Sequence, residues 1–137
     1  MIKGRFVKGE QAISKDPEVA YFYAKEILWD RFPIAKKISK YPRSGYLYAL
    51  NVIKDRFPEA EPTIAKDPKY SCLYEMDVIK GKFSIGEPAI STDPGYSYVY
   101  AKNVIGEKFQ EGEPEIAKDP ELARSYAERF SCPEILE

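Results

Sequence analysis

The residues that could do acid–base or metal chemistry in this chain are almost all carboxylates. The 137 residues include 22 Asp and Glu, two cysteines and no histidine, so catalytic triads, Cys–His pairs and imidazole-ligated zinc sites are excluded within the chain. Cys72 and Cys132 lie 60 residues apart without a partner motif, which argues against a disulfide framework or a thiolate zinc site. No nucleophile or phosphate loop accompanies the carboxylates. The sequence therefore predicts no catalytic, cofactor-binding or metal-ligating residue and no enzyme.

Two recurring rows of cations could follow a phosphate backbone. The first row is Arg5, Arg31, Arg56, Lys82 and Lys108, and the second is Lys15, Lys40, Lys66 and Lys118. In most cases a glutamate follows the first-row cation by five residues and is suited to pairing with it (Glu10, Glu61, Glu87, Glu113). Because the net charge is -1, nucleic-acid binding is the less favoured interpretation.

Membrane insertion is not expected. The longest stretch without a charged residue runs over 10 residues, from Ser44 to Ile53, whereas a bilayer span needs roughly 20. No basic and apolar leader opens the sequence. We expect a protein of the cytoplasm with no membrane partner.

Internal repetition organises the whole chain. A basic residue followed by phenylalanine recurs at Phe6, Phe32, Phe57, Phe83 and Phe109, with spacings of 26, 25, 26 and 26. Isoleucine recurs at Ile13, Ile38, Ile64, Ile90 and Ile116. A capping position followed by proline recurs at Asp16, Tyr41, Asp67, Asp93 and Asp119, and tyrosine recurs at Tyr23, Tyr48, Tyr74, Tyr100 and Tyr126.

Each repeat is predicted to form a helix pair. Asp-Pro is a strong helix start, because the carboxylate accepts from free first-turn amides and proline needs no donor there. The segment that follows is apolar on two flanks, as expected of a helix sandwiched between neighbours. The other segment, such as 61–66, carries proline in its first turn (Pro62, Pro88, Pro114) and should be shorter than two turns.

We therefore predict an all-α fold, a short α-solenoid of five tandem repeats of about 26 residues, each a short helix plus a helix of about 12 residues. The repeats are expected over 3–28, 29–53, 54–79, 80–105 and 106–130, as one domain spanning 1–137 in a right-handed stack. Residues 131–137 should form a C-terminal cap. Arg124, Ser125 and Arg129 give the last repeat the polar outer face that a terminal repeat needs.

The pattern basic-Phe-x-x-Gly/Ala-Glu-Pro-x-Ile-x-Lys-Asp-Pro-x-x-small-Tyr-x-Tyr-Ala-x-x-Val-Ile resembles a short repeat of tailed-bacteriophage proteins. The resemblance covers about Gly4 to Phe130 and is best over Lys80 to Ile105. The chain departs from it at Lys36 and Tyr41, and at Glu75, where alanine is usual. The resemblance implies a phage origin and a helical scaffold, and it carries no catalytic residues.

Two recurring or exceptional features have a structural and a functional interpretation. The tyrosine ladder could be a platform for bases or a peptide, but small residues beside it favour core packing. Glu75 stands where the other repeats have alanine, so its carboxylate either presses against apolar neighbours, swings outward or pairs with a cation.

Residues that differ between repeats are the best candidates for an interface, because the recurring ones are used in packing. These candidates are Trp29, Lys36, Lys37, Lys40, Tyr41, Arg43, Tyr70 and Tyr96. Trp29 lies at the junction between repeats near a cluster of cations, so it could be an interface anchor or a packing accident at the one-residue deletion in the second repeat. We expect a protein-binding module without cofactor that engages a host or phage protein, for example by occluding a bacterial defence component. Nucleic-acid binding and a self-assembling homo-oligomer are the alternatives.

Overall fold

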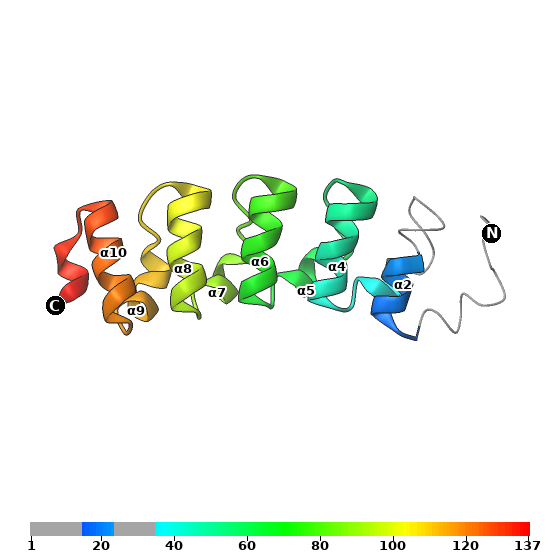
Figure 1. The fold of residues 1–137 in the computed structure, drawn as a ribbon, viewed down its shortest axis with the longest axis horizontal. Coiled ribbons are helices and arrows are strands. Elements are labelled where there is room, and N and C mark those ends of the chain that lie inside the picture. Colours follow the sequence, from blue (N-terminus) through cyan, green and yellow to red (C-terminus); the bar gives the residue numbers. More distant parts are fainter. Residues whose placement is uncertain (1–14, 24–34) are drawn as a thin grey trace. The chain divides into compact units, whose positions relative to one another are not determined.

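The computed structural model describes residues 15–23 and 35–137, which fold into helices with no strand among them (Figure 1). Two compact units divide the chain, Met1–Ile64 and Ala65–Glu137, and each is described by itself. The prediction of an all-helical chain of tandem repeats is confirmed for the described residues.

The longer helix of every repeat begins at the proline of the capping motif. These helices are α2 (Pro17–Tyr23), α4 (Pro42–Tyr48), α6 (Pro68–Tyr74), α8 (Pro94–Tyr100) and α10 (Pro120–Phe130). Four of the five capping residues are aspartates whose side chains accept hydrogen bonds from first-turn amides: Asp16, Asp67, Asp93 and Asp119. The predicted helix starts are therefore confirmed, together with the mechanism that sets them.

Three of the longer helices end in a π-helical turn. These turns are η2 (Ala49–Ile53), η3 (Glu75–Ile79) and η4 (Ala101–Ile105). Each stops at a residue in the left-handed region, where Lys54, Lys80 and Gly106 have φ values of 57°, 55° and 68°. Helix α10 has no such turn and stops at Ser131, with φ of 51°. The π-helical turn was not predicted from the sequence.

The four shorter helices in the described residues have one turn each, as predicted for three of them from Pro62, Pro88 and Pro114. They are α3 (Ala35–Ile38), α5 (Glu61–Ile64), α7 (Glu87–Ile90) and α9 (Glu113–Ile116), the last preceded by the 3-10 turn η5 (Gln110–Gly112). The isoleucine that ends each of them is fully buried. Gly112 permits a close approach to α8, because a Cβ added there would lie 2.6 Å from Cβ of Ser97.

Repeats pack in sequence order inside each unit. In the first unit α4 contacts α2, α3 and α5, and in the second unit α8 contacts α6, α9 and α10. The core of the second unit contains side chains from all three of its repeats: Cys72, Ile90, Tyr100, Ala101, Phe109, Ile116, Tyr126 and Cys132. The right-handed sense of the stack and the single domain over 1–137 stay predictions.

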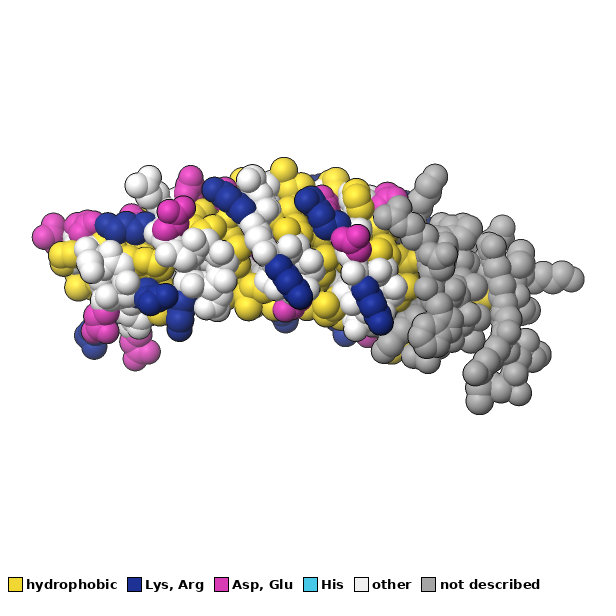
Figure 2. All heavy atoms as spheres, turned by 90° about the horizontal axis from the view of Figure 1, so that it is seen from above, with side chains coloured by type: hydrophobic (Ala, Val, Ile, Leu, Met, Phe, Trp, Pro, Cys, Tyr) yellow, Lys and Arg dark blue, Asp and Glu magenta, His cyan; other side chains and the backbone are white. Residues whose placement is uncertain are grey.

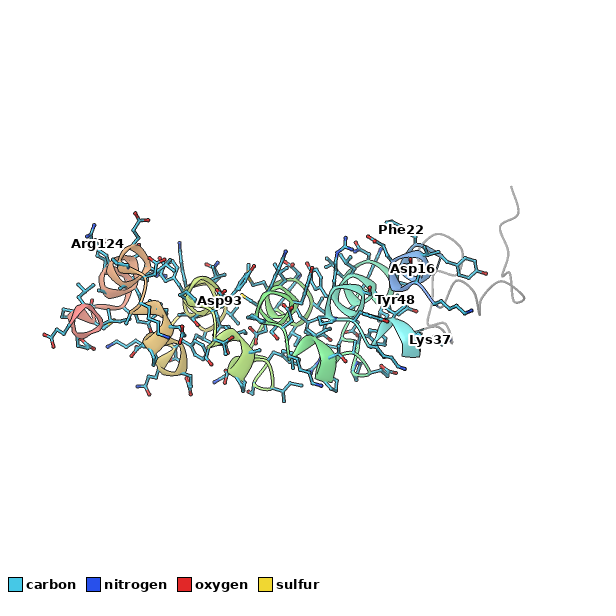
Figure 3. All side chains as sticks on the ribbon, turned by 90° about the horizontal axis from the view of Figure 1, so that it is seen from below. Asp16, Phe22, Lys37, Tyr48, Asp93 and Arg124 are labelled. Atoms are coloured by element: carbon cyan, nitrogen blue, oxygen red, sulfur yellow. The ribbon has the colours of Figure 1, made fainter. Side chains whose placement is uncertain are left out.

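The C-terminal tail covers the end of α10, as predicted for a cap. The 3-10 turn η6 (Pro133–Leu136) packs on α10, and Cys132 beside it is only 1% exposed. Arg124 and Arg129 are exposed on α10, and Figure 3 shows Arg124 at its surface. The last repeat therefore has the polar surface that was expected of it.

Candidate functional site

The turn between α3 and α4 gathers four of the predicted interface residues in the first unit. Lys37 lies on α3 (Figure 3), Lys40 and Tyr41 lie in the turn, and Arg43 is in the first turn of α4. All four are exposed, and Tyr41 keeps 49% of its surface accessible. Arg43 also pairs with Glu18 of α2 at 2.8 Å. We call Lys37, Lys40, Tyr41 and Arg43 the α3–α4 corner.

Tyr41 occupies a helix-capping position without capping the helix. Its backbone has the extended conformation usual for such a position, with φ of −122° and ψ of 123°. Its side chain makes no hydrogen bond to the first-turn amides of α4, whereas the aspartates at the equivalent sites do. The corner therefore gives up a stabilising cap of about 1 kcal/mol and places an aromatic ring in solvent.

The other four predicted interface residues lie outside the described part of the chain or belong to the second unit. Trp29 lies outside the described residues, and so does the side chain of Lys36. Tyr70 and Tyr96 belong to the second unit, on α6 and α8, and both are half-buried. The ammonium group of Lys69 lies 5.5 Å from the centroid of the Tyr70 ring, and Tyr96 packs against the core.

The tyrosine ladder is a core element, which confirms the structural interpretation for four of its five members. Tyr48, Tyr74, Tyr100 and Tyr126 are each 0% exposed, and Tyr23 is half-buried. In three repeats the ring packs on the phenylalanine that follows nine residues later, with centroid distances of 4.8–5.3 Å: Tyr48–Phe57, Tyr74–Phe83 and Tyr100–Phe109. A ring enclosed in this way offers no stacking platform to a ligand.

The first cation row is held by carboxylates in the described residues. Arg56 forms two hydrogen bonds with Glu61, at 2.8 and 2.9 Å, and Lys82 lies 3.3 Å from Glu87. Lys108 instead pairs with Glu134 of the cap at 3.1 Å. The face seen in Figure 2 correspondingly shows Lys and Arg side chains with Asp and Glu among them. Arg5 and Arg31 lie outside the described residues.

Glu75 is buried, which is one of the three outcomes expected for it. Its side chain is 0% exposed. One carboxylate oxygen, Oε1, accepts a hydrogen bond of 3.0 Å from the backbone amide of Phe83. The other, Oε2, is buried without a hydrogen-bond partner, the one such side-chain atom in the part of the chain that the structure describes.

Burial changes the titration of Glu75 and of its neighbours. The pKa of the Glu75 carboxyl is raised from 4.5 to about 8, chiefly by burial. The Phe83 amide and Lys82 lower it, and the charge of Glu87 adds to the increase. Burial together with the charges of Glu75 and Asp77 raises the pKa of the Cys72 thiol to about 12. The carboxyl of Glu75 is therefore protonated at neutral pH, and Cys72 is an unreactive thiol.

Sequence reasoning missed a hydrogen-bond network around the buried tyrosine hydroxyls. The hydroxyl of Tyr126 accepts from the backbone amide of Phe109 at 2.8 Å and donates to Glu113 at 2.9 Å. The hydroxyl of Tyr100 donates to Glu87. The pKa of each tyrosine hydroxyl is raised. Burial is the largest cause, and the hydrogen bond to the glutamate is the second. The signal was present in the sequence, since a glutamate precedes each of these tyrosines by 13 residues.

No protein-family model, curated protein or solved structure matches the chain. Among residues 15–23 and 35–137, no helix is long and apolar enough to cross a bilayer. The same residues contain no group of three or more Cys, Asp or Glu side chains that could hold a metal ion.

Proposed function

We propose that this chain is a non-enzymatic repeat scaffold that binds a protein partner through the α3–α4 corner. The observation that carries the proposal is Tyr41, an exposed aromatic side chain at a position where the other described repeats use a capping aspartate. Natural sequences depart from local stability rules most often where function requires it.

The chemistry of the corner suits a protein partner. An aromatic ring with cations beside it can enter an apolar pocket while the cations meet carboxylates around its rim. Lys37 and Lys40 carry such cations, and Arg43 beside them is paired with Glu18. The expected partner therefore presents an acidic surface with an apolar depression.

The source of the partner follows from the sequence resemblance. A repeat similar to those of tailed-bacteriophage proteins favours a phage-encoded protein that acts in the host cytoplasm on a host or phage protein. Occlusion of a bacterial defence component is the concrete version of this proposal.

Tyr41→Asp separates binding from folding, because it should increase the stability of the chain and weaken binding of the partner. The new carboxylate restores the cap and should stabilise the chain by about 1 kcal/mol. At the same time it removes the aromatic anchor, so a partner captured from bacterial lysate by the parent chain should be lost. The measurements are thermal unfolding and quantitative mass spectrometry of the captured proteins.

Lys40→Glu and Lys66→Glu form a matched pair for the same capture experiment. Both lysines are exposed and occupy the same place in successive repeats, but only Lys40 belongs to the corner. We expect Lys40→Glu to reduce recovery of the partner and Lys66→Glu to leave it unchanged. Equal recovery by Tyr41→Asp, Lys40→Glu and the parent chain would contradict the proposal.

Two alternatives predict other results. Nucleic-acid binding predicts a mobility shift at low salt with steep salt dependence, and the pairing of Arg56 and Lys82 with glutamates argues against it. Self-assembly predicts light scattering that changes across a dilution series.

A further inference from the structure

The second unit contains a small cavity at the loop-side ends of two long helices. Its volume is about 240 Å³, and it is lined by Glu75, Met76, Lys80, Gly81, Asn103 and Val104. Two of these residues belong to the turn η3, two follow it, and two belong to η4. This space is large enough for a short organic chain.

One lining residue holds a polar atom that its surroundings leave unsatisfied. Glu75 lines the cavity, and its Oε2 is buried without a partner while Oε1 is engaged by the Phe83 amide. A buried polar atom without a hydrogen bond is unfavourable, so such an atom in a native structure calls for an explanation. A bound donor in the adjoining cavity would provide one.

The residue at this position is special to one repeat. The equivalent residues Ala49, Ala101 and Ala127 are all buried alanines, so packing alone is satisfied by a methyl group. Gly81, which lines the cavity, also differs from the equivalent Asp55 and Glu107, because it carries no side chain. Glu75 and a residue without a side chain, Gly81, therefore occur in the same part of the cavity wall.

We propose that this cavity binds a primary ammonium group on a short apolar stem, and that the Glu75 carboxyl turns toward it, releases its proton to solvent and accepts a hydrogen bond from the ammonium. Met76 and Val104 supply the apolar wall for the stem, and the amide oxygen of Asn103 offers a second acceptor. Such a group occurs in small amines and at the end of a lysine side chain of another protein.

The binding experiment uses isopentylammonium chloride as the probe and the full chain labelled with ¹⁵N. The amide signals of Gly81 and Asn103 report on the cavity, and that of Gly112 serves as a distant reference. Isopentanol and isovalerate, with the same stem but no ammonium, are the control ligands. A peptide with a central lysine, compared with the same peptide carrying norleucine, tests the side-chain source.

Two variants should change the affinity in opposite directions. Glu75→Ala reproduces the other repeats and should weaken isopentylammonium binding at least about tenfold. Lys80→Gly reproduces Gly106 of the next repeat, removes a like charge from the wall, and should strengthen binding roughly twofold.

The expected result is a saturable shift of Gly81 and Asn103 by isopentylammonium and none by isovalerate. Absence of any shift, an equal shift by isopentanol, or an unchanged affinity in Glu75→Ala would overturn the proposal. A shift by the free amine without one by the lysine peptide would assign the site to small molecules, and the reverse would assign it to a protein side chain. Glu75→Ala and Lys80→Gly leave the α3–α4 corner unchanged, so failure of this proposal can be distinguished from failure of the proposed function.

Discussion

At the junction between α6 and α8 a carboxylate holds the backbone amide of Phe83, whereas between α8 and α10 a tyrosine hydroxyl holds the equivalent amide of Phe109. The acceptors are Glu75 in the first case and Tyr126 in the second. The hydroxyl also donates to Glu113, so its hydrogen-bonding capacity is used. The carboxylate accepts one bond and leaves its other oxygen without a partner.

The difference shows that the repeat requires an acceptor at this place but not a particular side chain. A buried backbone amide needs a partner, and the two junctions supply it from different elements. The Tyr126 hydroxyl both accepts and donates a hydrogen bond. The Glu75 carboxyl makes its junction sensitive to pH and leaves one oxygen without a hydrogen bond.

The largest expected effect is the pH dependence of the Glu75 junction. The pKa of the carboxyl is about 8 in the folded chain and near 4.3 when unfolded, so only the folded chain holds this proton between those values. The free energy of unfolding should therefore fall as pH rises through that range, by about 5 kcal/mol in total, and level off above pH 8. Urea unfolding at successive pH values measures it.

Glu75→Gln is the control for this pH dependence, because the amide keeps an acceptor for Phe83 and cannot ionise. Across pH 4.5–8 the free energy of unfolding of the parent chain should decrease relative to that of Glu75→Gln as pH rises. A difference that stays constant over this range would show that the carboxyl is not buried in the way described.

The next largest effect is a difference in stability between Tyr126→Phe and Tyr100→Phe. Tyr126→Phe removes the acceptor of the Phe109 amide and the donor to Glu113, and should lower the free energy of unfolding by about 2–3 kcal/mol. Tyr100→Phe removes only the bond to Glu87, because Glu75 still holds the Phe83 amide, and should lower it by about 1 kcal/mol. Equal losses in chemical denaturation would mean that Glu75 does not replace the hydroxyl.

The smallest expected effect on stability concerns two glycines at equivalent positions of the two junctions, Gly86 and Gly112. A Cβ at Gly112 would lie 2.6 Å from Ser97, and one at Gly86 would lie 3.0 Å from Ser71. Gly112→Ala should therefore destabilise by about 2 kcal/mol and Gly86→Ala by about 1 kcal/mol. If thermal unfolding reversed this order, the spacing of the helices at the two junctions would differ from that described.

Local sequence signals predicted much of the fold. Asp67, Asp93 and Asp119 cap helices as expected, because the cap depends on a few neighbouring residues. The burial of Tyr100 and Tyr126 followed from their place in the repeat. Tyr41 shows the limit, since its position predicted a helix start but not that its side chain would remain in solvent.

Contacts between distant residues could not be predicted in the same way. Phe130 aligns in sequence with Val104, yet its ring packs 4.7 Å from Tyr126, in the role that Phe109 has beside Tyr100. After α10 the chain continues into η6, and Phe130 of α10 itself supplies the ring that packs on Tyr126. The acceptor for the Phe83 amide depends on how two elements meet. The α3–α4 corner was predicted in composition, whereas the cavity beside Glu75 was not.

Amide hydrogen exchange at Phe83 and Phe109 tests the account of the two junctions most directly. Both amides should be strongly protected at pH 6. After correction for the intrinsic rate and for global stability, protection of Phe83 should fall as pH rises through about 8, when the Glu75 junction gains a buried charge. Protection of Phe109 should stay unchanged over the same range. Parallel behaviour of the two amides, or an unprotected Phe83 at pH 6, would contradict it.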